Sequence, residues 1–125
     1  IGKLVTNGVV LEPHEYETVV YFLKLGNDVE LIPASHTPKM KRADFWMDGL
    51  EWEPKVPFIN TKRAVERMFF RALEQSKNVV FDLRKLKGED QIAIETLEFC
   101  FKTTRSMRSL LIVAKDGTFK KCKKK

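Results

Sequence analysis

Two carboxylates and an amine flank a tight-turn signal in this chain, and their spacing could assemble a cation site. Asp48-Gly49 favours a two-residue type I′ hairpin, because both positions accept a positive φ. Pairing outward from that turn places Asp44 opposite Glu53, and Lys55 shares their face because side chains alternate along a strand. Opposed like charges destabilise a sheet unless they are neutralised. The pattern predicts a Mg²⁺ or Mn²⁺ site beside an ammonium group; the alternative is a solvated hairpin face with Lys55 as counter-ion.

The same register divides the apolar residues of the hairpin between two faces. Trp46 is expected on the carboxylate face, where a helix covers it or where it stacks on a nucleic-acid base. The opposite face is expected to join the core, with Phe45, Met47, Leu50 and Trp52.

The composition limits the class of protein. The chain has 125 residues, 43% apolar and 32% charged, which suffices for one core and one domain over 1–125. It has no apolar stretch of about 20 residues and no signal-peptide pattern, so a soluble domain that does not contact membrane is expected. A net charge of +6 and a pI near 9.4 favour nucleic acid as the partner. Cys100 is expected in a helix core and Cys122 in a solvated tail.

Hydrophobic periodicity and turn residues predict alternating helices and strands. The expected order is a leader segment (1–12), a helix (13–25), a strand (28–32), a basic loop (33–42), the hairpin, a helix (60–76), a strand (78–83), a helix (89–104), a strand (109–114) and a basic tail (117–125). A helix between two strands normally makes a right-handed crossover to a parallel neighbour. The expected fold is α/β, a mixed sheet of about five strands flanked by helices, with an α-β-β-β-α-β core followed by an extra α-β.

Basic side chains provide candidate contacts to phosphates. Arg63, Arg67 and Arg71 recur every four residues and form a stripe along the helix 60–76, which is either a phosphate-binding surface or ordinary surface charge. Gln75 and Asp82 are candidates to support the catalytic residues from behind. The alternative for Gln75 is a polar residue at a helix end, and the alternative for Asp82 is a carboxylate paired with a cation. The expected substrate contacts are Lys39, Lys41, Arg42, Arg63, Arg67 and Arg84.

The element order resembles the PD-(D/E)xK phosphodiesterase superfamily, which includes restriction endonucleases. The resemblance covers roughly residues 13 to 83, with Asp44 on one strand and Glu53-Pro54-Lys55 on the next. The superfamily often adds a glutamate on the first helix, followed eleven residues later by a glycine; Glu15 and Gly26 have this spacing, and Glu17 is the rival. The resemblance implies that Asp44, Glu53 and Glu15 bind the cation and that these three act with Lys55 in catalysis.

A narrower resemblance links most of the chain to C-terminal tRNase toxin domains of contact-dependent growth inhibition proteins, which also occur on phage head-morphogenesis-like proteins. It implies a tRNA-cleaving endonuclease, exported on a larger protein, active in the cytoplasm of a target bacterium and inhibited by a cognate immunity protein. The chain departs from that family after Lys55, where Val56-Pro57-Phe58-Ile59-Asn60 replaces a glycine-rich segment. The matching runs are His14-Glu15-Tyr16-Glu17-Thr18, Asp44, Met47-Asp48-Gly49, Trp52-Glu53-Pro54-Lys55 and 75–84.

Two other functions remain open from the residues. A metal-independent ribonuclease would use His14 as acid or base, with Lys55, Arg84 or Thr18 stabilising the phosphate. A basic binding module without catalysis would bind RNA in a salt-sensitive manner and cleave nothing. A chelator separates the two enzymes, because it stops only the metal-dependent one.

Overall fold

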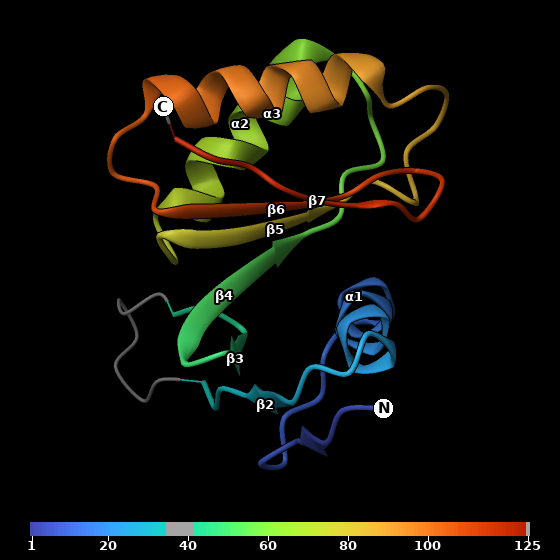
Figure 1. Cartoon of the computed structure of the whole chain (residues 1–125), viewed down its shortest axis with the longest axis vertical. Coiled ribbons are helices and arrows are strands. Elements are labelled where there is room, and N and C mark those ends of the chain that lie inside the picture. Colours follow the sequence, from blue (N-terminus) through green and yellow to red (C-terminus); the bar gives the residue numbers. More distant parts are fainter. Residues whose placement is uncertain (35–41, 125) are drawn as a thin grey trace.

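The chain forms an α/β fold in which helices flank one mixed sheet (Figure 1). The computed structural model describes residues 1–34 and 42–124. No helix within these ranges is long and apolar enough to cross a membrane. The elements are β1 (Leu4–Val5), α1 (Pro13–Lys24), β2 (Val29–Leu31), β3 (Phe45–Met47), β4 (Leu50–Lys55), α2 (Lys62–Leu73), β5 (Asn78–Asp82), α3 (Gln91–Thr103), β6 (Ser109–Val113) and β7 (Phe119–Lys121).

The strands lie in the sheet in the order in which they occur in the chain, from β1 to β7. The pairs β1/β2, β4/β5 and β5/β6 are parallel, and β2/β3, β3/β4 and β6/β7 are antiparallel. The expected fold class is confirmed. The sheet has seven strands because segments interpreted as leader and tail add β1 and β7 at its edges. Strands of two or three residues leave too short an alternation in a sequence to be recognised.

The helices cover different parts of the sheet. In Figure 1, α2 and α3 lie together over β5 and β6, and α1 lies beside β4. One core cluster packs Phe81 and Ile112 against α2 and α3, and the other packs Val80 and Leu111 against α1. Because side chains alternate along a strand, β5 and β6 are buried on both faces and read as continuous apolar runs. Glu53 is in register with Val79, on the face covered by α2 and α3.

The hairpin forms as the turn signal indicates. Asp48 and Gly49 have φ values of 52° and 76°, as a type I′ turn requires. The register pairs Phe45 with Trp52, which confirms the expected pairing, and Phe45, Met47 and Trp52 are buried. Leu50 was expected in the core but is 42% exposed, because it is the first residue after the turn, at the end of the hairpin; its partner Met47 is buried.

The C-terminal segment differs from the expected solvated tail. Cys122 is buried, and its backbone N–H donates to the carbonyl of Leu110. Burial raises the pKa of the Cys122 thiol to about 11. Cys100 is buried in α3 as expected. Both cysteines therefore serve as small core residues rather than as reactive thiols.

Candidate functional site

Glu53 and Lys55 lie on one face of β4 and form an ion pair. Nζ of Lys55 is 3.4 Å from Oε2 of Glu53, whose residue is only 2% exposed. The other carboxylate oxygen of Glu53, Oε1, is buried and has no hydrogen-bond partner among the described residues. Leaving a buried carboxylate oxygen without a partner is costly, so this atom is available to a ligand.

Asp44 and Glu15 complete a group of three carboxyls. Asp44 directly precedes β3, and its backbone N–H donates to the carbonyl of Trp52 at 3.0 Å. Glu15 lies in the first turn of α1, where its Oε1 also accepts from the N–H of Glu12 at 3.3 Å in a capping box. The side chains of Asp44 and Glu15 share a hydrogen bond, and Glu53 is close enough to repel Asp44 electrostatically.

Two of these carboxyls, Asp44 and Glu53, hold their protons unusually tightly. Burial, the charge of Glu53 and the contact with Glu15 raise the pKa of Asp44 to about 8. Burial raises the pKa of Glu53 to about 7, although the Lys55 ammonium opposes the increase. Carboxylic acids that remain partly protonated near neutral pH indicate a site where negative charge exceeds its compensation.

The chemistry of these donors fits a hard divalent cation, since carboxylate oxygens are its preferred ligands. The buried unpartnered oxygen of Glu53 and the mutual repulsion of Asp44 and Glu53 are both relieved by a positive ion. Among the described residues, no group of three or more His, Cys, Asp or Glu side chains is already arranged to hold a metal ion. The carboxyls would therefore have to move from their mutual hydrogen bond to bind one together.

Gln75 supports Lys55 from the segment that follows α2. Its Oε1 accepts from Nζ of Lys55 at 3.4 Å, and its Nε2 donates to the carbonyl of Arg42 at 3.5 Å. Arg42 pairs with Glu51 at 3.4 Å, and its guanidinium lies 5.9 Å from the ring centre of Trp46. Trp46 is half-buried beside Arg42. Gln75 thus joins the ammonium of the site to a basic residue at its rim.

A pocket of about 420 Å³ opens beside the three carboxyls, and Glu15 is one of its lining residues. Its polar lining comes from Glu15 and Lys55 on one side and from Arg67 and Arg71 of α2 on another. The segment that replaces the expected glycine-rich stretch forms an apolar wall, in which Phe58 is 48% exposed. The pocket therefore combines a carboxylate group, cations and an exposed aromatic ring.

The other expected site residues differ in whether they line this pocket. Arg63 is exposed on α2 but does not line the pocket, and Lys39 and Lys41 lie outside the described residues. Glu17 pairs with Lys85 at 3.0 Å, so Glu15 is the helix glutamate that meets Asp44. His14 lines the pocket, 3.3 Å from a Glu12 oxygen.

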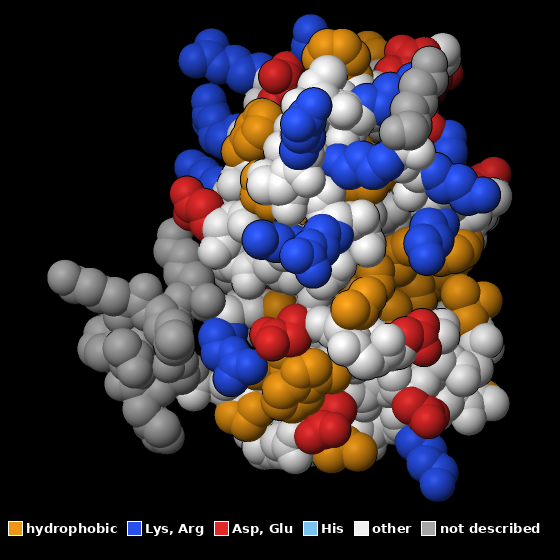
Figure 2. All heavy atoms as spheres, turned by 60° about the vertical axis from the view of Figure 1, so that its left-hand side comes forward, with side chains coloured by type: hydrophobic (Ala, Val, Ile, Leu, Met, Phe, Trp, Pro, Cys, Tyr) orange, Lys and Arg blue, Asp and Glu red, His pale blue; other side chains and the backbone are white. Residues whose placement is uncertain are grey.

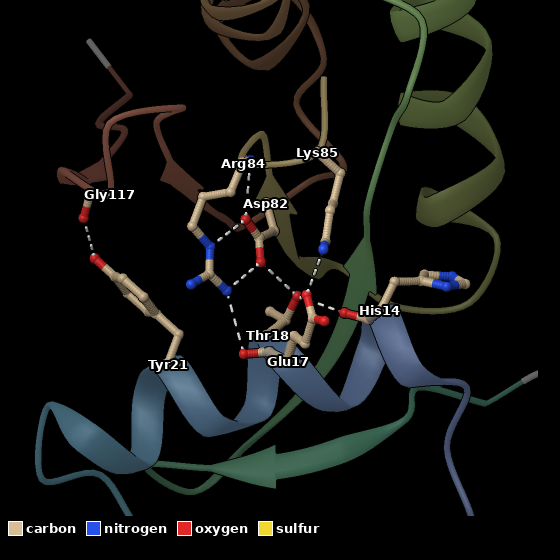
Figure 3. A network of polar contacts seen from close by, with 8 residues as sticks. All are labelled: His14, Glu17, Thr18, Tyr21, Asp82, Arg84, Lys85 and Gly117. Atoms are coloured by element: carbon tan, nitrogen blue, oxygen red, sulfur yellow. Dashed lines mark hydrogen bonds and ion pairs between the residues drawn. The ribbon is translucent and has the colours of Figure 1, made fainter. Parts of the chain in front are cut away.

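Asp82 and Arg84 form a separate network with α1 (Figure 3). The guanidinium of Arg84 makes a two-pronged ion pair with Asp82, at 2.9 Å and 2.8 Å, so its Nε and Nη2 are engaged within the fold. Thr18 is fully buried and donates to Asp82, which excludes it from stabilising a phosphate directly. Sequence reasoning did not identify Thr18 as a structural partner, because its contact spans 64 positions in the chain.

The end of the molecule that carries α2 and α3 is rich in Lys and Arg side chains on the face shown in Figure 2. Two further exposed cations lie in the connections that precede β5 and β6. Lys77 and Arg108 lie next to each other, since the N–H of Arg108 donates to the carbonyl of Lys77 at 2.8 Å. The spacing in the sequence could not reveal this pair, because the parallel pairing of β5 and β6 creates it.

Comparisons with known proteins identify the family and a similar fold. Residues 41–119 match the family described as the contact-dependent growth inhibition CdiA C-terminal domain. The chain is similar in fold to a solved structure, "CdiA-CT/CdiI toxin and immunity complex from Burkholderia pseudomallei", with a TM-score of 0.74, 16% identity and coverage of 98% of this chain and 99% of that one. No curated protein sequence matches. The family match spans more than half of the chain, which therefore belongs to the CdiA C-terminal toxin domain family of contact-dependent growth inhibition.

Proposed function

We propose that the chain is a toxin endonuclease that hydrolyses phosphodiester bonds of RNA, with tRNA as its substrate, and that it belongs to the PD-(D/E)xK superfamily. The observation that carries this proposal is the meeting of Glu15, Asp44 and Glu53 with the amine of Lys55. These are the residues of the resemblance, and they come from three separate segments of the chain. The family match and the basic surface support a toxin that acts on a polyanion.

Asp44, Glu53 and Glu15 would hold the divalent cation. Mg²⁺ or Mn²⁺ would supply Lewis-acid activation of the scissile phosphate and of the attacking water. The buried Oε1 of Glu53 is the donor best prepared for this role, because it has no partner among the described residues. On binding it, Asp44 and Glu15 would give up their mutual hydrogen bond, and Asp44 would lose its proton.

Lys55 provides the positive charge for the phosphate. Its Nζ is oriented by Glu53 and Gln75, each at 3.4 Å, and a third N–H remains to donate to a phosphate oxygen. A fixed ammonium stabilises the charge that develops in the transition state more than it stabilises the ground state. Gln75 keeps that ammonium directed at the site.

The pocket and its surroundings would hold RNA around the reacting bond. Arg67 and Arg71 line the pocket and can pair with phosphates on either side of the cleaved one. The exposed ring of Phe58 stands beside His14, 5.9 Å between ring centres, and offers a surface on which an unpaired base can stack. Lys77 and Arg108 extend the cationic surface, as a substrate of the size of tRNA requires.

The test is cleavage of total tRNA by the wild type, Glu53→Gln and Lys55→Ala, each with Mg²⁺ and with a chelator. We expect only the wild type with Mg²⁺ to cleave. Glu30→Gln is the matched control, because it makes the same substitution at an exposed position of the same sheet, on strand β2. Equal cleavage by all of these proteins would refute the metal site, and the absence of cleavage in the wild type would leave a binding module.

His14 supports a second candidate, a metal-independent ribonuclease. Its ring lines the same pocket as Lys55 and Arg67, so an acid–base group and two cations face one space. This mechanism predicts cleavage that continues in chelator and stops in His14→Ala. Metal-dependent hydrolysis predicts the reverse dependence on the chelator.

We also propose that a cognate immunity protein binds the chain. The similar solved structure is described as a toxin and immunity complex. An immunity protein encoded beside this chain should co-purify with it and stop tRNA cleavage in a mixture of the two. An unrelated immunity protein serves as the control and should leave cleavage unchanged.

A further inference from the structure

The second buried carboxylate of the molecule, Asp82, ties the end of β5 to α1 (Figure 3). Its Oδ2 accepts from the hydroxyl of Thr18 at 2.7 Å and from Nη2 of Arg84 at 2.8 Å. Its Oδ1 accepts from Nε and from the backbone N–H of Arg84, at 2.9 Å and 3.2 Å. Both carboxylate oxygens are therefore satisfied by contacts whose directions are fixed.

The same arginine holds α1 at two further points. Nη2 of Arg84 donates to the carbonyl of Glu17 at 3.2 Å, and the guanidinium lies 4.9 Å from the ring centre of Tyr21. Figure 3 shows that these contacts come from one side of the helix and meet the connection that follows β5. The polar contacts thus define both the rotation and the axial position of α1.

The apolar face of α1 cannot define them as well. Val19, Phe22 and Leu23 pack against the sheet, but apolar contacts are non-directional and tolerate small rotations. A carboxylate about 6 Å from a helix axis moves by about 2 Å when the helix rotates by about 20°. Catalytic groups lose much of their effect when displaced by about 1 Å.

Thr18 lies one helical turn after Glu15. Among the described residues, Glu15 is the only residue of α1 in the group formed with Asp44 and Glu53. We propose that Thr18, Asp82 and Arg84 form a latch that positions Glu15 against Asp44. The proposal rests on the proposed function and assigns these three residues a positioning role in it. The proposal assigns a role to the ion pair of Asp82 and Arg84, which lies apart from the pocket of about 420 Å³.

A pair of variants at Thr18 separates the latch from packing. Thr18→Val keeps the shape of the side chain and removes the hydroxyl, whereas Thr18→Ser keeps the hydroxyl and removes the methyl group. If the latch positions Glu15, Thr18→Val lowers kcat on tRNA about tenfold with KM unchanged, and Thr18→Ser retains the wild-type kcat. Equal losses in the two variants would overturn the latch in favour of packing.

A double-mutant cycle shows whether the effect passes through Glu15. In Glu15→Gln the latch has nothing to position, so Thr18→Val should cause no further loss of kcat. A tenfold loss in both backgrounds would overturn the proposal. Tyr21→Phe is the control: it removes the hydrogen bond from Tyr21 to the carbonyl of Gly117 on the same helix and leaves the latch intact, so kcat should not change.

Two further readouts do not depend on cleavage. Calorimetric titration with Mg²⁺ should show several-fold weaker binding to Thr18→Val and wild-type binding to Thr18→Ser. Crystal structures of both variants should show the contact between Glu15 and Asp44 lost in Thr18→Val and kept in Thr18→Ser. A wild type that cleaves no RNA would refute the proposed function. These structures would still decide the latch, because a contact retained in Thr18→Val would overturn it.

Discussion

Glu53 and Asp82 are carboxylates on adjacent parallel strands, each only 2% exposed, yet their surroundings affect them in opposite directions. Burial raises the pKa of Glu53 to about 7, and Lys55 only partly compensates it. Burial acts on Asp82 as well, but hydrogen bonds from Arg84 and Thr18 outweigh it and hold the pKa of Asp82 below its ordinary value.

The difference between the two sites lies in their hydrogen bonds. Every oxygen of Asp82 has a donor, whereas Oε1 of Glu53 has none among the described residues. A fully satisfied buried carboxylate stabilises a fold, and an unsatisfied one among like charges is prepared for a ligand. Equal burial therefore does not imply an equal role.

The largest expected effect separates the two carboxylates by activity. Glu53→Gln should lower the rate of tRNA cleavage about 10²- to 10³-fold, because it removes a charged ligand of the cation that would activate the phosphate. Its melting temperature at pH 8 should equal or exceed that of the wild type, since an unsatisfied buried charge is removed. Cleavage assays and thermal unfolding measure both. A fall in melting temperature with activity intact would reverse the assignment.

The next effect concerns stability. Asp82→Asn should lower the free energy of unfolding by about 2–3 kcal/mol at pH 7, because it breaks a charged pair that also holds Thr18. The lowered pKa of Asp82 means that its contribution is present above the unfolded pKa of about 3.9 and is lost as the pH falls through the folded value. Urea unfolding should show the two proteins converging in acid. A constant difference at every pH would contradict the ion-pair account.

A further effect is the pH dependence of stability that Asp44 and Glu53 cause. Folded Asp44 and Glu53 have pKa values of about 8 and about 7, above the unfolded values of about 3.9 and about 4.3. The folded chain therefore binds more protons than the unfolded chain between these limits, and stability falls as the pH rises from about 4 to about 8. Urea unfolding in chelator should show this fall in the wild type and a weaker one in Asp44→Asn. Mg²⁺ should restore stability at pH 8, and a flat profile in the wild type would contradict the shifts.

The smallest effect concerns the arginines of α2 that would bind the substrate beside the site. Arg67→Ala should raise KM for tRNA about three- to tenfold, because Arg67 lines the pocket, and should reduce the salt dependence of binding by about one charge. Arg63→Ala is the matched control on the same helix outside the pocket and should change KM less. Steady-state kinetics at several salt concentrations distinguish them. Equal effects would indicate a uniform cationic surface.

The local pattern predicted the features whose causes are local. The type I′ turn at Asp48-Gly49 and the pairing of Phe45 with Trp52 followed from dihedral preference and alternation, and the structure confirms both. The shared face of Glu53 and Lys55 followed from the same alternation. The resemblance to the superfamily, through the spacing of Glu15 and Gly26, indicated a glutamate on the first helix but left Glu17 as a rival.

Other features depend on contacts between distant segments. Arg84 resembles any phosphate-binding arginine in the sequence, and only the packing of α1 against the end of β5 pairs it with Asp82 and with the carbonyl of Glu17. The edge strands β1 and β7 form because a finished sheet offers unpaired backbone groups to short segments that would not be strands alone.

The sequence alone determined the hairpin, its register and the side of the strand on which Glu53 and Lys55 lie, because turn dihedrals and a two-residue repeat act over a few bonds. The tertiary structure decided which helix glutamate reaches Asp44 and which buried carboxylate has both of its oxygens hydrogen-bonded. Those outcomes depend on where a rigid helix docks, and docking follows from packing and hydrogen bonds between residues far apart in the chain.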